Sequence, residues 1–274
     1  MSERSERLVI RNPKRPDPGT DIELAERAAR AAAAVLLSAY GLPPEGLGSK
    51  SSPTDLVSDA DRRAERAIRD LLAAERPDDG LVAEEGSHSQ AASGRRWIVD
   101  PLDGTINFLY GFPAWAVSVA LEDAAGLAVG VVLDPVRDEC FIAERGAGAR
   151  LRGPYGDALP LRVRDRRELD RALVATGFSY EPARRAAQAD VVRRMLPRVR
   201  DIRRAGAAAL DLAWLAAGRV DAYFERGLQP WDRAAGELLV REAGGAIAEL
   251  DGDPRGVVAA ATPELLAELA GLVG

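Results

Sequence analysis

Two aspartates leave one apolar run together in the stretch WIVDPLDGTINF, which covers residues 97–108. This run predicts a buried strand that ends at Asp100 and Asp103, with Pro101 fixing the turn between them. Gly104 allows a close backbone approach at a place where unpaired amides can bind an oxyanion. Since two carboxylates repel a phosphate unless divalent cations lie between them, the segment indicates a metal-assisted phosphate site. The competing interpretation is that both acids only stabilise a turn and cap a helix.

Three other segments present acids in a similar setting. The run LVAEEG ends at Glu84, so two predicted strands finish in carboxylates. Asp55, in SSPTDLVSDAD, lies where a loop becomes a helix, and Asp61 follows one turn later. For Asp61 we favour a cap or a solvated helix acid. The stretch QPWDRAAGELLVREAGG places Asp232 at the beginning of a helix, where a simple N-cap is the alternative interpretation.

Composition limits the chemistry that the chain can perform. It has 274 residues with 37 basic and 43 acidic side chains, a formal charge of -6, which argues against a surface that coats nucleic acid. Cys140 and His88 are the only residues of their kinds, so an internal disulfide is excluded. A Cys/His zinc site and a triad built on His88 are both disfavoured. The chemistry must therefore come from carboxylates, hydroxyls, arginines or a bound metal.

The elements that position these residues divide into three predicted parts. Residues 1–20 are charged and rich in proline and predict a flexible N-terminal arm. Residues 21–155 predict an α+β half, in which two helices precede short strands in an antiparallel sheet, and this half carries most of the acids. Residues 156–274 predict an α/β half with alternating strands and helices, which carries Asp232 and the specificity residues. We expect the two halves to share an extensive interface.

The same reading gives an expected location. No apolar run approaches the roughly 20 residues of a membrane helix. The beginning MSERSERLVI lacks the apolar core of a secretory signal. We therefore expect a cytoplasmic protein without membrane contact.

Four motifs together resemble one known family. KSSPTDLVSDAD, LVAEEG, WIVDPLDGTINF and QPWDRAAGELLVREAGG, in this order between Lys50 and Gly245, resemble the inositol monophosphatase family of magnesium-dependent, lithium-sensitive phosphatases. The arrangement of RRAGAAALDLAWLAAGRVDAYFERG is similar to the bacterial inositol-1-phosphatase branch. The resemblance implies a layered αβαβα sandwich of the inositol monophosphatase and fructose-1,6-bisphosphatase type, with a metal cleft where the halves meet. Relatives of this kind are commonly homodimers.

The resemblance also implies a set of metal ligands for two or three Mg²⁺ ions. Glu84, Asp100 and the backbone carbonyl of Leu102 would hold the first ion. Asp100, Asp103 and Asp232 would hold the second, and Glu84 would reach a third, weaker ion through water. Elementary physics agrees, because four carboxylates in one cleft cannot all stay ionised without compensation. Hard oxygen ligands without imidazole or thiolate favour Mg²⁺ over zinc.

Roles in catalysis and substrate binding follow from the same resemblance. Asp55 and Thr105 would orient and help deprotonate the attacking water, with Glu84 contributing through the third ion. The amides of Gly104 and Thr105 would hold the phosphate, with Asp103 beside it, and Glu225 would bind substrate hydroxyls. The remaining expected substrate-binding residues are Gly206, Ala207 and Ala208. Ala207 lacks the hydroxyl that some family members carry there.

The implied reaction is hydrolysis of inositol-1-phosphate or a similar polyol phosphate. Metals about 3.5–4 Å apart can activate water on one side and stabilise the leaving alkoxide on the other. Other substrates of related phosphatases stay open: fructose-1,6-bisphosphate, histidinol phosphate and a 3′-phosphoadenosine nucleotide. Glu225 and the AGAAALD segment favour inositol phosphate.

Rival interpretations from other classes have less support. A cysteine phosphatase needs an arginine six residues after Cys140, where Gly146 stands. Asp251 and Asp253 imitate the motif of phosphatases that form an aspartyl phosphate, but the Asp-Gly dipeptide fits a turn. Cys140 is expected to be a buried apolar residue on a strand. A regulatory protein that binds transcription machinery is an additional role rather than an alternative, with the arm and residues 193–204 as contact candidates.

Overall fold

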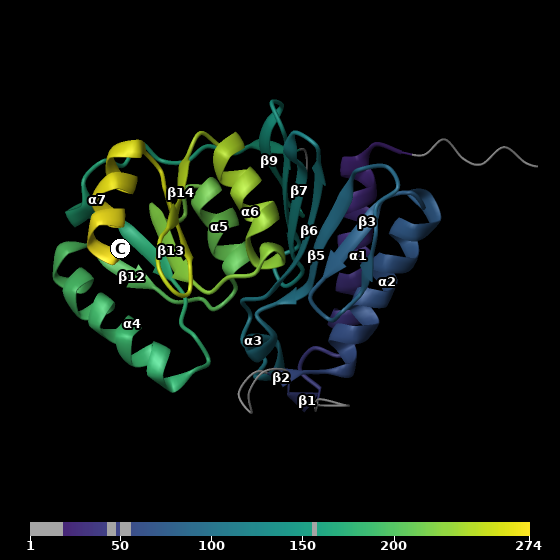
Figure 1. The fold of residues 1–274 in the computed structure, drawn as a ribbon, viewed down its shortest axis with the longest axis horizontal. Coiled ribbons are helices and arrows are strands. Elements are labelled where there is room, and N and C mark those ends of the chain that lie inside the picture. The colour runs from purple at the N-terminus through teal and green to yellow at the C-terminus, as the bar shows by residue number, and fades with distance from the viewer. Residues whose placement is uncertain (1–18, 43–47, 50–55, 155–157) are drawn as a thin grey trace, which may run out of the picture.

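The computed structural model describes residues 19–42, 48–49, 56–154 and 158–274 (Figure 1). Five layers succeed one another across the view: a helical pair, a large sheet, a second helical pair, a small sheet and an outer helical layer. This confirms the predicted αβαβα sandwich. The predicted arm lies almost wholly outside the described residues, and Asp55 lies entirely outside them.

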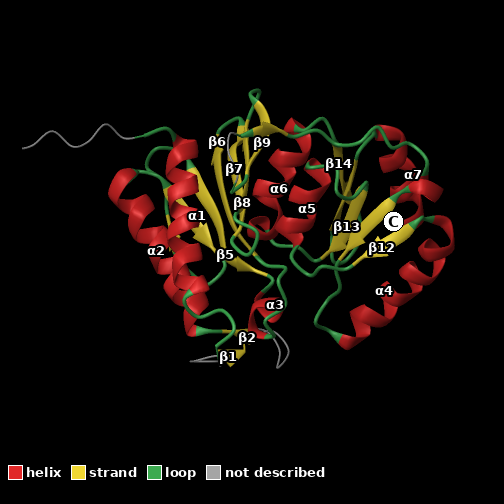
Figure 2. Ribbon diagram, turned by 180° about the vertical axis from the view of Figure 1, so that it is seen from behind, coloured by secondary structure: helices red, strands yellow, loops and turns green. Residues whose placement is uncertain are grey.

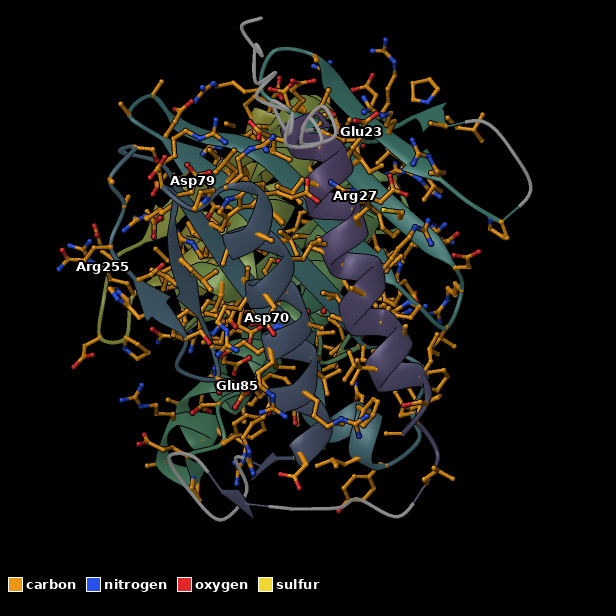
Figure 3. All side chains as sticks on the ribbon, turned by 90° about the vertical axis from the view of Figure 1, so that its right-hand side faces the viewer. Glu23, Arg27, Asp70, Asp79, Glu85 and Arg255 are labelled. Atoms are coloured by element: carbon orange, nitrogen blue, oxygen red, sulfur yellow. The ribbon has the colours of Figure 1, made fainter. Side chains whose placement is uncertain are left out.

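The first layer consists of α1 (Asp21–Leu37) and α2 (Asp59–Glu75), which lie side by side in front of the large sheet in Figure 3. A capping box at Thr20 begins α1. In α2 the N-cap is Ser58, whose amide and hydroxyl both donate to Asp61 at 2.6 and 2.8 Å. Asp61 is therefore the third helical residue of a capping box and not the N-cap itself, and because it is fully buried the solvated alternative is wrong.

The large sheet contains eight strands in the order β10-β9-β8-β7-β6-β5-β3-β4. Their bounds are β3 (Gly80–Ala83), β4 (His88–Ser89), β5 (Arg96–Asp103), β6 (Ala116–Asp123), β7 (Gly126–Asp134), β8 (Glu139–Glu144), β9 (Gly148–Arg152) and β10 (Leu159–Pro160). Neighbours are antiparallel, as predicted, except that β3 and β5 run parallel with Ala83 opposite Val99. Because parallel strands end at the same edge, Glu84 and Asp100 emerge side by side. A separate short pair consists of β1 (Gly48–Ser49) and β2 (Leu56–Val57).

The middle layer consists of α5 (Ala208–Ala216) and α6 (Pro230–Glu242), which lie between the two sheets in Figures 1 and 2. A Cβ at Gly130 of β7 would lie 2.8 Å from the Ala235 carbonyl oxygen, so the glycine lets α6 approach the sheet closely. One buried core joins Phe141 of β8 to Leu212 and Leu238 of these helices. This shared core confirms the expected interface, while the division at residue 155 stays a prediction.

The small sheet has the order β12-β11-β13-β15-β14, with its first three strands parallel and the last two antiparallel. Its bounds are β11 (Leu173–Thr176), β12 (Asp201–Arg203), β13 (Ala222–Arg226), β14 (Ala246–Leu250) and β15 (Gly256–Ala260). The outer layer holds α4 (Pro182–Met195) and α7 (Pro263–Val273), with short 3₁₀ turns at Leu169–Arg171 and Leu196–Arg198. Only Met195 of α4 is buried.

Several minor predictions are also decided by the fold. Cys140 is fully buried on β8, as expected, and burial raises the pKa of its thiol to about 12. Asp251 and Asp253 lie in the turn between β14 and β15, which confirms the turn interpretation. No helix in the described part of the chain is both long and apolar enough to cross a membrane.

Candidate active site

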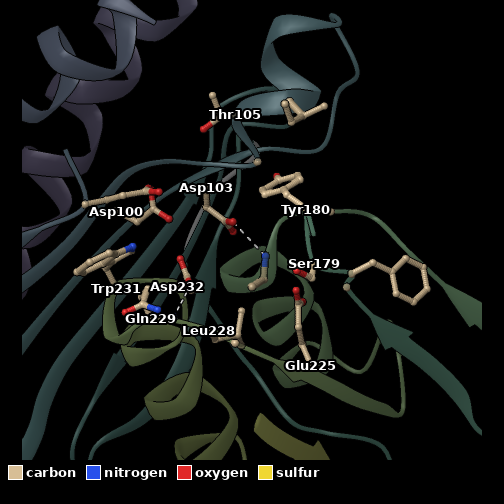
Figure 4. A pocket seen from close by; sticks show the side chains of 18 of the residues that line it. Asp100, Asp103, Thr105, Ser179, Tyr180, Glu225, Leu228, Gln229, Trp231 and Asp232 are labelled. Atoms are coloured by element: carbon tan, nitrogen blue, oxygen red, sulfur yellow. Dashed lines mark hydrogen bonds between the residues drawn. The ribbon is translucent and has the colours of Figure 1, made fainter. Parts of the chain in front are cut away.

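A pocket of about 440 Å³ lies where the ends of β3, β5 and β13 meet the beginnings of α5 and α6 (Figure 4). The structure brings together most of the residues predicted for the site. Those that line the pocket are Glu84, Asp100, Leu102, Asp103, Gly104, Thr105, Gly206, Ala208, Glu225 and Asp232. Ala207 does not line it and is buried behind it, close to Gly104. We call Glu84, Asp100, Asp103 and Asp232 the acid wall.

Asp100 lies at the centre of the acid wall. Its side chain is within hydrogen-bonding reach of the Glu84 carboxylate, and its Oδ1 accepts the Leu102 amide at 3.0 Å. Only 1% of Asp100 is exposed. Burial raises its pKa well above the usual range, and the charges of Glu84, Asp103 and Asp232 raise it further. This arrangement favours a proton or a cation beside Asp100.

Asp103 joins the two halves of the chain. Its carboxylate accepts the amides of Ala208 at 3.1 Å and Ala209 at 2.8 Å, at the beginning of α5. Burial raises the pKa of Asp103 to about 7, although these backbone amides lower it. The helix-capping interpretation is therefore partly right, but the capped helix lies about a hundred residues further along the chain. Sequence proximity could not have identified it.

Asp232 belongs to the first turn of α6. Its Oδ2 accepts the Gln229 amide at 2.6 Å in a capping box whose N-cap is Gln229, so the simple N-cap interpretation of Asp232 is wrong. Burial raises the pKa of Asp232 well above its usual range, and the Glu84 charge adds to this. Figure 4 shows the side chains of Asp100, Asp103 and Asp232 around one space.

The turn after β5 is built for close approach. Gly104 has φ 89° and ψ 38°, and a Cβ there would lie 3.0 Å from the Ala114 carbonyl oxygen, so only glycine fits. The next residue begins the short helix α3 (Thr105–Leu109), and the Thr105 hydroxyl donates to the Leu102 carbonyl at 3.1 Å. Within the described residues, the amides of Gly104 and Thr105 donate to no protein acceptor. They are available to an anion.

The acid wall fits a hard divalent cation by its chemistry. In the described part of the chain, no ion pair involves Asp100, Asp103 or Asp232, so their charges need another source of compensation. No three acids, imidazoles or thiols among those residues already surround a single point closely enough to hold an ion. Each of the three aspartates instead directs an oxygen to a backbone amide. The donor set of carboxylate oxygens remains the one that Mg²⁺ prefers.

Glu225 lines the pocket from β13. The Tyr223 hydroxyl donates to its Oε2 at 2.6 Å. Burial raises the pKa of Glu225, while the Tyr223 hydroxyl and the Arg204 charge lower it. The carboxylate lies directly over Gly177, where any Cβ would collide with it. A residue with a side chain at 177 would therefore displace the Glu225 carboxylate from this position.

A second group of lining residues was missed by the sequence analysis. It consists of Phe178, Tyr180, Arg184 and Arg204, which we call the arginine wall. The Arg204 guanidinium lies 5.9 Å from the centre of the Phe178 ring, and Arg184 Nε lies 2.6 Å from Glu181. These residues come from two stretches, residues 178–184 and Arg204, without a shared motif, so no sequence signal joined them.

Asn107 was also missed, although it lies within the motif that contains Thr105. Its Nδ2 donates to the carbonyls of Ala114 at 2.6 Å and Ala205 at 2.8 Å. These bonds hold the loop before α5 against α3. An amide side chain two residues after Thr105 was the available signal.

Comparisons with known proteins agree with this geometry. A sequence model of the Inositol monophosphatase family matches residues 17–273. The chain is 42% identical to the Nus factor SuhB of Salmonella typhimurium over 233 residues, 84% of this chain and 85% of that protein. It is 45% identical to the inositol-1-monophosphatase of Mycobacterium leprae over 204 residues, 73% of this chain and 70% of that one.

A solved structure is similar over nearly the whole length. The crystal structure of the extragenic suppressor protein suhB from Bartonella henselae has a TM-score of 0.83 and 38% identity, covering 92% of this chain and 97% of that chain. Sequence motifs, layered fold and pocket thus agree with one another, and this chain belongs to the inositol monophosphatase family.

Proposed function

We propose that this chain is a Mg²⁺-dependent phosphomonoesterase that hydrolyses inositol-1-phosphate or a similar polyol phosphate. The observation that carries the proposal is the acid wall, where four carboxylates line one pocket. Beside them are the amides of Gly104 and Thr105, which donate to no protein acceptor within the described residues. Family membership supports it. Bound Mg²⁺ would neutralise the acid wall, activate a water molecule and stabilise the leaving oxygen.

The proposed ligands are those of the resemblance. Glu84, Asp100 and the Leu102 carbonyl would hold one ion, and Asp100, Asp103 and Asp232 would hold another. Glu84 would contribute to a third through water. Asp100 and Asp232 each have an oxygen beyond the one that accepts a backbone amide, and these oxygens are available to a cation. Both oxygens of Asp103 already accept amides at the beginning of α5, so Asp103 would bind a cation through its remaining lone pairs.

The remaining residues bind substrate and water. The Thr105 hydroxyl donates its hydrogen bond to the Leu102 carbonyl, so its oxygen can accept a hydrogen bond from the attacking water. We propose that Asp55 helps to orient the same water. The amides of Gly104 and Thr105 hold the phosphate. Glu225 accepts substrate hydroxyls, with the lining residues Gly206 and Ala208 beside it. Ala207 lies behind Gly104 and supports the part of the pocket that Gly206 and Ala208 line.

Phosphate release from a panel of esters, with and without Mg²⁺, tests the proposal. We expect rapid Mg²⁺-dependent hydrolysis of inositol-1-phosphate, and inhibition by Li⁺ that weakens as Mg²⁺ rises. Absence of hydrolysis of every ester at saturating Mg²⁺ would show that the proposal is wrong. Histidinol phosphate and a 3′-phosphoadenosine nucleotide belong to the same panel.

A bisphosphate such as fructose-1,6-bisphosphate is a second candidate substrate, favoured by the arginine wall. Arg184 and Arg204 line the same pocket as the acid wall and could pair with a second phosphate. Arg184→Ala and Arg204→Ala should then reduce kcat/KM for the bisphosphate more than for inositol-1-phosphate. Equal losses for both esters would remove this candidate.

An additional binding role is suggested by the names of relatives. The Salmonella typhimurium protein is called a Nus factor, and we propose that this chain too associates with transcription machinery. We also propose a cytoplasmic homodimer. The side chains of Tyr110 and Phe112 are 82% and 53% exposed, and these exposed aromatic rings support a contact between two copies of the chain. Light scattering after gel filtration tests the dimer, and capture of RNA polymerase from lysate tests the other role.

A further inference from the structure

We propose that Glu65 is a positioning residue: it holds the turn that carries Glu84 and thereby sets the affinity of the pocket for Mg²⁺. The inference rests on the proposed function, in which Glu84 binds the cation. Glu65 does not line the pocket and lies on α2, in a different layer of the fold. Only 4% of it is exposed, so its carboxylate is committed to the interior.

The turn at residues 84–87 follows β3 and has four amides that need acceptors. The Glu84 amide donates to the Val99 carbonyl of β5 at 3.2 Å, and the Gly86 amide donates back to the Ala83 carbonyl at 3.3 Å. Both of these bonds stay within the sheet and its own turn. The amides of Glu85 and Ser87 have no backbone acceptor in the described structure. Because buried amides are rarely left without any acceptor, a side chain is expected to supply one.

Glu65 supplies both missing acceptors. Its Oε2 accepts the Glu85 amide at 2.6 Å, and its Oε1 accepts the Ser87 amide at 2.9 Å. Figure 3 shows Glu85 beside α2. A carboxylate that receives two amides makes stronger bonds than a neutral acceptor. Among the described residues no ion pair involves Glu65, so the two amides are its charge partners.

The turn matters because the Glu84 side chain faces a neighbour of its own charge. Asp100 lies within hydrogen-bonding reach, and two carboxylates at this distance repel each other when both are ionised. The backbone of Glu84 is anchored on one side by Val99 and on the other through the Glu85 amide. If Glu65 releases that amide, repulsion can move Glu84 away from Asp100. The cation then loses part of its ligand set.

Glu65→Gln tests this, because an amide side chain retains one acceptor but opposes a donor to the other backbone amide. We expect a dissociation constant for Mg²⁺, measured by calorimetry on the full chain, about 10–100-fold above wild type. The Mg²⁺ concentration for half-maximal hydrolysis of inositol-1-phosphate should rise in parallel, while the rate at saturating Mg²⁺ stays near wild type. Hydrogen exchange at the Glu85 and Ser87 amides should become faster.

Asp134→Asn is the matched control. Asp134 is also a buried acid that accepts two turn amides, those of Val136 and Arg137 at 3.1 Å each, but none of these residues lines the pocket. This variant should lose thermal stability without a change in Mg²⁺ affinity. An equal effect of both variants on Mg²⁺ binding would overturn the positioning role.

Glu84→Gln separates this inference from the function on which it rests. If Glu84→Gln binds Mg²⁺ as wild type does, the proposed metal site is wrong and the role of Glu65 falls with it. If Glu84→Gln weakens Mg²⁺ binding but folded Glu65→Gln does not, only the role of Glu65 is overturned. Should Glu65→Gln fail to fold, Glu65→Asp decides, since its shorter side chain cannot span both amides, and unchanged Mg²⁺ binding would reject the role.

Discussion

The acid wall and the arginine wall line one pocket together, yet they are built differently. Asp100 is 1% exposed and Asp103 8%, and each has a carboxylate oxygen held by a backbone amide. On the arginine wall Tyr180 is 40% exposed, and the Arg184 side chain is 46% exposed. Buried and tethered acids suit chemistry that needs fixed geometry, whereas exposed arginines and aromatics can adapt to the remainder of a substrate.

The largest expected effect concerns the centre of the acid wall. Asp100→Asn should reduce turnover at least about 100-fold, because it weakens two proposed metal positions at once. The metal-free variant should nevertheless melt at a higher temperature than metal-free wild type, since a neutral amide needs neither the proton nor the cation that Asp100 requires when it is buried among like charges. Phosphate release and thermal melting in chelator measure both. Wild-type turnover at low Mg²⁺ would contradict the central role of Asp100.

A smaller effect is expected at the edge of the acid wall. Asp232→Asn should raise the Mg²⁺ concentration for half-maximal activity about tenfold or more, because only one proposed metal position loses a ligand. Glu237→Gln, on the same helix and paired with Arg233, serves as the control and should leave the Mg²⁺ titration unchanged. Identical titration curves for Asp232→Asn and wild type would exclude Asp232 as a ligand.

The role of Glu225 in substrate binding is tested by substitution. Glu225→Gln should lower kcat/KM for inositol-1-phosphate about tenfold through a lost charged hydrogen bond, and should affect a simple aryl phosphate much less. Tyr223→Phe, which removes the hydroxyl bonded to Glu225, should show a weaker form of the same preference. Equal losses on both esters would mean that Glu225 does not read the substrate.

The smallest expected effect is a dependence of stability on pH. The pKa of Asp103 is raised to about 7 by burial, against about 4 in an unfolded chain, so between these values the folded state binds more protons. For this group the free energy of unfolding therefore falls as pH rises through that window. Mg²⁺ competes with the proton, so its stabilisation should be larger at about pH 8 than at about pH 5.

Melting temperatures with Mg²⁺ and with chelator at the two pH values measure this difference, which should amount to a few degrees. Asp103→Asn should reduce it. A Mg²⁺ effect that is independent of pH would show that protons and the cation do not share the acid wall.

The acid wall was largely predictable because its residues lie in short motifs. Glu84 and Asp100 were each found at the end of an apolar run and Asp232 at the beginning of a helix, and the layered fold followed from the family resemblance that these motifs carry. The arginine wall was not predictable, since residues 178–184 and Arg204 come from two stretches without a shared motif. The partners of Asp103 were equally hidden, because a helix cap supplied from a distant strand leaves no local pattern.

By itself the amino-acid sequence determined which side chains are available for chemistry and which strands and helices present them, because periodicity and turn residues act over a few positions. Only the tertiary structure decided that β3 and β5 run parallel, so that Glu84 meets Asp100, and that Glu65 on α2 accepts two amides of the turn after β3. These contacts join positions far apart in the chain. Their geometry depends on how whole layers pack, which no local pattern of residues encodes.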